Sequence, residues 1–276
     1  MSRIAETFRR LRENRRTALV PYLAAGYPSP SATVAMMHAA VAAGADILEL
    51  GVPFSDPAAD GPVIQKACEE ALAQGVTLAD VLGMVARFRE QDSRTPVVLM
   101  GYLNPVETRG EEQFADGAAR AGVDGVLLVD MPPEESGSLA PLLRRQNLDL
   151  IRLLSPTTSA ERRRRICDSA SGFVYYVSIK GVTGAGGLDL EDVRRRVGEI
   201  GAVTELPVGV GFGIRTPQTA AAVAGFADAV IVGSALIQAI QAADHPADDA
   251  SAVVGRLVGE FRTALDVHPA NASTMA

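Results

Sequence analysis

Two carboxylates lie close together in the chain, in a setting that would make them reactive. Residues 46–62, DILELGVPFSDPAADGP, begin as an apolar strand interrupted by Glu49 and continue into a loop that carries Asp60. A strand buried on both faces normally reads as a continuous apolar run, and an unpaired charge within it is costly to bury. Glu49 is therefore expected to be paired, protonated or catalytic, and two such carboxylates suit acid–base chemistry. The alternative is a Glu held in a salt bridge and an Asp that caps the next helix.

Short apolar strands and amphipathic helices alternate along most of the chain and would position these carboxylates. The pattern predicts strands over residues 18–23, 47–50, 97–100, 125–129, 150–154, 173–177, 207–210 and 229–232. It predicts helices between them over residues 31–43, 78–91, 111–121, 134–146, 159–170, 190–200 and 217–224. Alternation of this kind implies a parallel sheet, and eight units are the number in a TIM barrel.

We therefore predict an α/β fold, a (β/α)8 TIM barrel with an extra N-terminal helix and additional helices after strands 2 and 8. The extra helices are expected over residues 2–14, 62–74 and 248–265, the last following a helix that ends near residue 242. No linker or charge block divides the pattern, so we expect a single domain over residues 1–268 and a frayed tail over residues 269–276. An open doubly wound sheet is the alternative, but no GxGxxG motif follows the first strand.

Composition restricts the classes of function. The net charge of −7 and the isoelectric point near 5.1 argue against a nucleic-acid partner. Two cysteines without paired spacing fit a reducing compartment, and none of the three histidines follows a predicted strand, so no metal site is expected. The charged N-terminus does not read as a signal peptide, and no segment approaches the ~20 apolar residues of a membrane span, so a cytoplasmic location is expected.

Two glycine motifs end the last two predicted strands. Gly211, Phe212 and Gly213 follow strand seven, and Gly233 and Ser234 follow strand eight. In a TIM barrel these strand ends are neighbours and often form a phosphate site. Glycine lets backbone N–H groups approach an anion, and a helix N-terminus adds positive partial charge. The pair of motifs predicts phosphate binding; the alternative is two tight turns with a serine cap.

A third glycine-rich segment and several aromatic side chains are expected at the same end of the barrel. Residues 181–187, GVTGAGG, follow strand six and would form either a loop that closes over a ligand or an ordinary flexible loop. Tyr22, Tyr102, Tyr175 and Phe212 would add aromatic surface suited to a planar aromatic ligand. Taken singly, each ring is more typical of core filling than of ligand contact.

The stretch LELGVPFSDPAADGP resembles the signature of the tryptophan synthase alpha chain family. The resemblance continues in order through MGYLNP, VDMPPEE, YYVSIKGVTGA, VGFGI and VGSA. It implies a lyase that cleaves indole-3-glycerol phosphate to indole and glyceraldehyde 3-phosphate by a retro-aldol reaction. It implies no cofactor or metal in this chain, and a beta chain with pyridoxal phosphate as the partner in an alpha–beta–beta–alpha heterotetramer.

The resemblance also implies residue roles. Glu49 matches the residue that protonates indole C3 and accepts the glycerol hydroxyl proton, and Asp60 matches the carboxylate that interacts with the indole N–H. Thr183 would contact Asp60 when the glycine-rich loop closes. The predicted substrate-binding residues are Tyr22, Tyr102, Tyr175, Thr183, Gly184, Gly211, Phe212, Gly213, Gly233 and Ser234, of which Gly184, Phe212, Gly213, Gly233 and Ser234 would hold the phosphate.

Three positions depart from the family pattern. Ala58 stands where a larger apolar residue is usual, in the loop that faces the beta chain, while Gly186 replaces a frequent arginine and Tyr27 a frequent aspartate. Ala58 keeps open a lyase that works alone, without a beta chain. Other phosphate-binding barrels, such as sugar-phosphate epimerases or isomerases, would share the glycine turns but not the signature. A non-catalytic barrel that binds a phosphate ligand and regulates a partner is the alternative from a different class.

Overall fold

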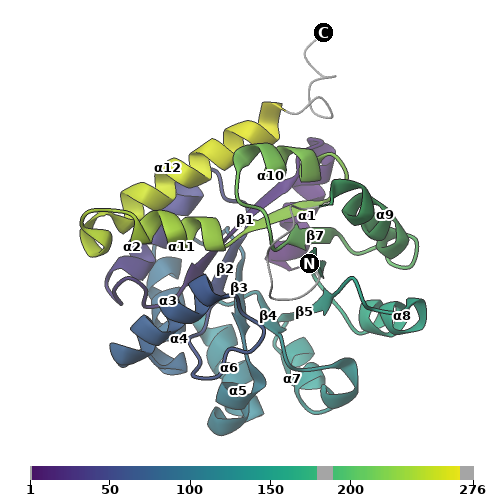
Figure 1. Ribbon diagram of the computed structural model, residues 1–276. Coiled ribbons are helices and arrows are strands. Elements are labelled where there is room, and N and C mark those ends of the chain that lie inside the picture. The colour runs from purple at the N-terminus through teal and green to yellow at the C-terminus, as the bar shows by residue number, and fades with distance from the viewer. Residues whose placement is uncertain (1, 179–188, 268–276) are drawn as a thin grey trace.

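The computed structural model describes residues 2–178 and 189–267, and its strands form one closed parallel barrel. The strand order follows the chain, with β8 hydrogen-bonded to β1, and the helices surround the barrel (Figure 1). The strands are β1 Ala18–Ala24, β2 Leu48–Gly51, β3 Val97–Gly101, β4 Gly125–Leu128, β5 Asp149–Leu154, β6 Val174–Val177, β7 Val208–Gly211 and β8 Ala229–Val232. The prediction of a (β/α)8 TIM barrel is confirmed.

Helices follow every strand and cover the outside of the barrel. They are α2 Ala32–Ala42, α3 Pro62–Ala73, α4 Leu78–Arg89, α5 Leu103–Arg109, α6 Glu111–Ala121, α7 Leu139–Arg145, α8 Ala160–Asp168, α9 Leu190–Gly201, α10 Pro217–Ala224 and α11 Ser234–Gln241. Helix α1, Arg3–Glu13, precedes the barrel, and α12, Pro246–Val267, packs against α2, α10 and α11 (Figure 1). The extra helices predicted at the N-terminus and after strands 2 and 8 are confirmed.

Two predicted segments differ in the structure. Helix α5 occupies Leu103–Arg109, where the sequence analysis predicted no helix. Its Pro105 lies in the first turn, where a missing N–H breaks no helical hydrogen bond. The single helix predicted over 134–146 is instead a short 3₁₀ turn, η1, Pro133–Glu135, followed by α7. Ser136 separates the two and donates its hydroxyl to the Pro133 carbonyl at 2.8 Å, an alternative to helical bonding.

One hydrogen-bond pattern closes the amino end of the barrel and occurs four times. In each case a residue shortly before an even-numbered strand donates its N–H to a carbonyl of the preceding odd-numbered strand. Its side chain accepts the N–H of that same residue, so both backbone groups are satisfied. The pairs are Asp46 with Leu19, Asp124 with Val97, Ser171 with Leu150, and Asp228 with Val208. The barrel is therefore built from four similar two-strand units.

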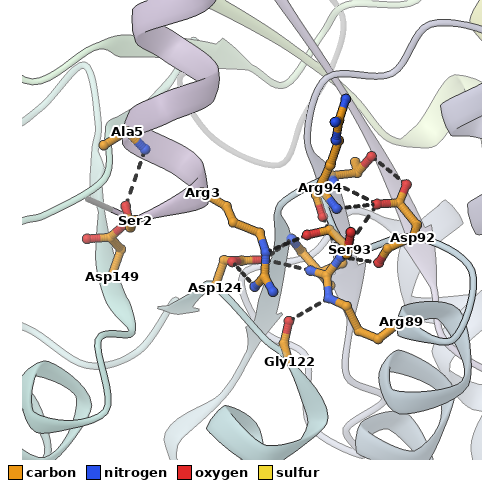
Figure 2. A network of polar contacts seen from close by, with 12 residues as sticks. Ser2, Arg3, Ala5, Arg89, Asp92, Ser93, Arg94, Gly122, Asp124 and Asp149 are labelled. Carbon is orange, nitrogen blue, oxygen red and sulfur yellow. Dashed lines mark hydrogen bonds and ion pairs between the residues drawn. The ribbon is translucent and has the colours of Figure 1, made fainter.

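Helix α1 covers the amino end of the barrel and is fixed there by polar contacts (Figure 2). Asp124 accepts hydrogen bonds from Arg3 of α1 at 2.8 Å and from Arg89 of α4 at 2.7 Å. Ser2 caps α1 and donates its hydroxyl to Asp149 of β5 at 2.6 Å (Figure 2). This end of the barrel is closed by structural contacts, which leaves the carboxyl ends of the strands for the site.

Candidate active site

Glu49 and Asp60 are buried together at the carboxyl end of β2. Glu49 lies within β2, opposite Tyr22 of β1 and Val98 of β3, and is 2% exposed. Asp60, 4% exposed, lies in the loop before α3, whose N-cap is Gly61. One carboxylate oxygen of each residue is buried without a hydrogen-bond partner, and no ion pair within the described residues involves either. The structure therefore has neither the salt-bridged Glu nor the capping Asp of the alternative.

The two carboxyl groups have different acidities. Burial raises the pKa of Glu49 to about 8, and the nearby charge of Asp60 adds to this effect. Burial raises the pKa of Asp60 to about 6, while a hydrogen bond from Tyr102 acts in the opposite direction. Near neutral pH, Glu49 is therefore mainly protonated and Asp60 mainly ionised. A pair with its pKa values separated in this way provides a proton donor and a negative charge in one site.

Tyr102, at the end of β3, holds the loop that carries Asp60. Its hydroxyl donates to Asp60 Oδ2 at 2.9 Å and accepts the N–H of Ala59 at 3.1 Å. Its ring stacks on Phe54 with 5.0 Å between centroids. The structure thus brings this predicted residue into direct contact with the carboxylate pair.

Tyr22 and Tyr175 lie inside the barrel in matching arrangements. The Tyr22 hydroxyl packs over Gly51 at the end of β2, and the Tyr175 hydroxyl packs over Gly211 at the end of β7. A Cβ at either glycine would lie 2.1 Å from the hydroxyl, so each glycine provides the space for its tyrosine. Burial raises both phenol pKa values, with smaller effects from the charges of the carboxylate pair. Both rings therefore belong to the interior that Glu49 faces.

Cys68 is a further residue of this region that the sequence did not single out. It lies on α3, is 3% exposed, and its pKa is raised to about 11, mainly by burial and next by the charge of Asp60. Its thiol also interacts with Tyr22 and with the backbone of Phe54. Asp60 lies in the loop just before α3 and Cys68 about two turns into that helix, and nothing in the sequence alone marked the thiol as part of the site.

The ends of β7 and β8 present backbone groups suited to an anion. Phe212 has φ of 66° and Gly213 of 79°, a left-handed backbone that is uncommon for a bulky residue and recurs at functional sites. Ser178 holds this turn by donating its hydroxyl to the carbonyls of Gly211 and Phe212. Strands β7 and β8 are hydrogen-bonded to each other, so the two glycine motifs are neighbours, as predicted.

The start of α11 completes this part of the site. Gly233 is the N-cap of α11, and Ser234 is its first residue. The predicted alternative of a serine cap is not observed, because no side chain caps this helix. The first N–H groups of a helix have no helical acceptor, and they carry positive partial charge. Leu236 N–H already bonds the Gly233 carbonyl at 2.9 Å, so the Ser234 hydroxyl and the first two N–H groups of α11 are the groups that can face an anion.

Some predicted residues fall outside the described part of the chain, and the other two departures from the family pattern differ in exposure. Thr183, Gly184 and Gly186 fall within residues 179–188, outside the described residues. Ala58 is exposed in the loop before Asp60, and Tyr27 is buried. Over residues 2–178 and 189–267, no three His, Cys, Asp or Glu side chains gather as a metal site.

Comparisons with known proteins agree over nearly the whole chain. A family model described as tryptophan synthase alpha chain matches residues 8–265. The tryptophan synthase alpha chain of Thioalkalivibrio sulfidiphilus is 59% identical over 96% of this chain and 100% of that protein. The one from Nitrosococcus oceani is 58% identical over 96% of this chain and 98% of that protein. The crystal structure of tryptophan synthase subunit alpha from Legionella pneumophila matches this chain with a TM-score of 0.90 at 47% sequence identity. The match covers 96% of this chain and 99% of that one.

Proposed function

This chain belongs to the tryptophan synthase alpha chain family, and we propose that Glu49 and Asp60 are the residues with which it cleaves indole-3-glycerol phosphate. The alpha chain is a lyase of tryptophan biosynthesis that releases indole and glyceraldehyde 3-phosphate. The observation that carries the assignment is the pair of buried carboxyl groups with separated pKa values, each with an unpartnered oxygen.

The reaction needs a proton to be delivered and another to be removed. Protonated Glu49 gives its proton to C3 of the indole ring, while ionised Asp60 accepts a hydrogen bond from the indole N–H and stabilises the positive charge that forms on nitrogen. The Glu49 carboxylate then takes the proton of the glycerol hydroxyl next to the ring. As that oxygen becomes a carbonyl, the carbon–carbon bond breaks and its electrons return to the indole ring. Indole and the aldehyde leave, and Glu49 is protonated again.

Binding of the substrate is assigned to the groups around the pair. The phosphate is held by Phe212, Gly213, Gly233 and Ser234, which is supported by the left-handed turn after β7 and the start of α11. Gly211 gives room to Tyr175, and the rings of Tyr22, Tyr102 and Tyr175 border the indole. Thr183 and Gly184 are proposed to complete the site from the loop outside the described residues.

Replacing Glu49 by Gln tests the assignment. The amide cannot transfer the proton, so we expect indole release to fall by about 10²–10⁴-fold, the usual contribution of a general acid–base group. Binding of glycerol 3-phosphate, measured by calorimetry, should stay unchanged because the phosphate groups are not altered. Asp60→Asn should also lose indole release. Turnover of Glu49→Gln comparable to the unaltered protein would disprove the role of Glu49.

Membership of the family implies a beta-chain partner, and we propose an alpha–beta–beta–alpha heterotetramer. The chemistry above uses proton transfer alone, which supports the proposal of a cofactor-free alpha chain. Pyridoxal phosphate is proposed to belong to the beta chain. Exposed Ala58 lies in the loop proposed to face that partner. Indole release measured alone and with beta chain distinguishes the alternatives: a strong rise indicates an ordinary alpha subunit, and no change indicates a lyase that works alone.

The location proposed for the enzyme is the cytoplasm. In the described part of the chain no single helix is long and apolar enough to cross a membrane. Helices α3 and α4 are long and apolar enough only when taken together, and the chain bends by 96° between them.

A further inference from the structure

A series of hydrogen bonds leads from Asp60 across the carboxyl ends of the next three strands. The first is the bond from the Tyr102 hydroxyl to Asp60 Oδ2, 2.9 Å long. Tyr102 is the N-cap of α5, and the next residue, Leu103, donates its N–H to Asp130 Oδ1 at 2.8 Å. Asp130 follows β4, so this second bond ties the start of α5 to the loop after β4.

The loop after β4 is in turn held by Arg152 of β5. Arg152 Nη1 donates to the Met131 carbonyl at 2.8 Å, and Met131 directly follows Asp130. Arg152 Nη2 donates to Ser136 Oγ at 2.6 Å, at the other end of the same loop. The guanidinium therefore bridges the two ends of a segment that also contains two prolines, whose φ angles are fixed. Arg152 is therefore connected to Asp60 in three steps: its bond to Met131 fixes the adjacent Asp130, Asp130 holds the start of α5, and Tyr102 at that start bonds Asp60.

The electrostatic setting of Arg152 is unlike that of the other buried arginines. Arg163 and Arg262 form ion pairs with Glu199 and Asp46, at 2.7 and 3.0 Å. Arg152 is 4% exposed and forms no ion pair within 4 Å among the described residues; burial lowers its pKa, and the charge of Glu134 offsets only part of this effect.

A buried cation without a paired anion is unfavourable for stability. Its two hydrogen bonds compensate in part, and Nε is buried without a partner. Natural proteins leave buried charges and polar atoms unpartnered mainly at functional sites.

We propose that Arg152 is a positioning residue for indole-3-glycerol phosphate cleavage, fixing the loop after β4 and, through Asp130 and Tyr102, the carboxylate of Asp60. The proposal rests on the role of Asp60 given under the proposed function. Arg152 does not touch the carboxylate pair. It acts by keeping the Tyr102 hydroxyl in register with Asp60 and Ala59.

The titration of Asp60 reports on this contact. The titratable groups that face Asp60 are Glu49 of β2, Tyr22 of β1, Tyr102, Tyr175 of β6 and Cys68 of α3. No basic side chain forms an ion pair with Asp60 in the part of the chain that is described. Because the hydrogen bond from Tyr102 lowers the pKa of Asp60, loosening that bond raises it.

The test compares Arg152→Met with Arg163→Met in pH profiles of kcat/KM for indole release, with excess beta chain. Arg152→Met should lower kcat/KM by roughly two- to thirty-fold, the range for residues coupled at a distance. It should move the acidic limb to higher pH by roughly half a unit, the value of one hydrogen bond. Arg163→Met removes a buried arginine outside this series and should leave that limb in place. Arg152→Lys, which keeps donors, should restore part of the rate.

Variants of Tyr102, Asp130 and Asp60 decide the interpretation. In a Tyr102→Phe background the limb should already be shifted, and adding Arg152→Met should shift it no further. If Arg152→Met does not fold, Asp130→Ala replaces it: Ala should shift the limb, and Asp130→Asn, which keeps an acceptor oxygen, should not. An unshifted limb in Arg152→Met, or in Asp130→Ala, overturns the proposal when Asp60→Asn is inactive. An active Asp60→Asn overturns the proposed function instead.

Discussion

Glu49 and Asp60 carry the same functional group, and the barrel gives them different acidities. Glu49 is on a strand in the interior and is opposed by a second carboxylate, whereas Asp60 is on a loop and accepts a hydrogen bond from Tyr102. Position in the fold, rather than residue type, separates a proton donor from an anion. The chemistry of the site depends on keeping this difference.

The separated pKa values predict a bell-shaped pH dependence of kcat/KM for indole release. Activity requires ionised Asp60 and protonated Glu49, so it should fall below about pH 6 and above about pH 8. The two apparent values belong to the interacting pair. A profile without an acidic limb in this range would contradict the ionised state assigned to Asp60.

Glu49 is also predicted to reduce stability as the pH rises. Folding raises its pKa from the ordinary 4.5 to about 8, so the folded state binds the proton more tightly. The stability linked to protonation is fully present below the ordinary value and is lost as pH rises through the folded value. Glu49→Gln should therefore be more stable than the unaltered protein near pH 8. The difference should be roughly 1.4 kcal/mol for each pH unit above the ordinary pKa of Glu49, up to its folded value. Urea unfolding near pH 5 and pH 8 measures this, and an equal difference at both pH values would contradict it.

At the scale of elements, the site depends on strand ends that make room for side chains of neighbouring strands. Gly211→Ala should lower indole release more than tenfold, because its Cβ would lie 2.1 Å from the Tyr175 hydroxyl and displace the ring. Gly198→Ala in α9 is the matched control, since no atom lies within 4 Å of its Cβ. This control should gain about 0.5–1 kcal/mol of stability from helix propensity and keep full activity. Full activity in Gly211→Ala would show that Tyr175 can move without consequence.

The elements themselves were largely predictable, and the exceptions have local causes. Strands such as β2 and β8 read as short apolar runs, and the helices between them as amphipathic segments, so periodicity gave their places. Helix α5 was missed because Pro105 reads as a loop signal, although proline fits the first turn of a helix. The break at Ser136 depends on a hydroxyl–carbonyl bond that no periodicity reports.

The candidate site was predictable in its residue types but not in its connections. Glu49 was identifiable because it interrupts an apolar strand, and the glycine motifs because they end neighbouring strands. Cys68 and Arg152 were not, because their roles follow from contacts between different elements of the fold. Those contacts depend on how neighbouring strand–helix units pack, which a linear pattern does not contain.

At the scale of the whole molecule, function and closure occupy opposite ends of the barrel. The carboxylate pair lies at the carboxyl end, whereas the repeated hydrogen-bond pattern closes the amino end. The polar contacts of α1 lie at that same end (Figure 2). Division of this kind is general in TIM barrels, where the amino face serves stability. Substitutions in the repeated pattern should therefore change stability and leave the chemistry intact.

Comparing two members of the repeated pattern tests this division. Asp228→Ala leaves the N–H of Val208 without its acceptor and should lower the free energy of unfolding by about 1 kcal/mol, while Asp228→Asn keeps an oxygen there and should lower it less. Asp124→Ala should lower it by about 3–5 kcal/mol, because it also leaves Arg3 and Arg89 without their shared carboxylate. Urea unfolding gives these values, and indole release per folded molecule should match that of the unaltered protein throughout. A loss of turnover in folded Asp228→Ala would mean that the amino end of the barrel also shapes the active site.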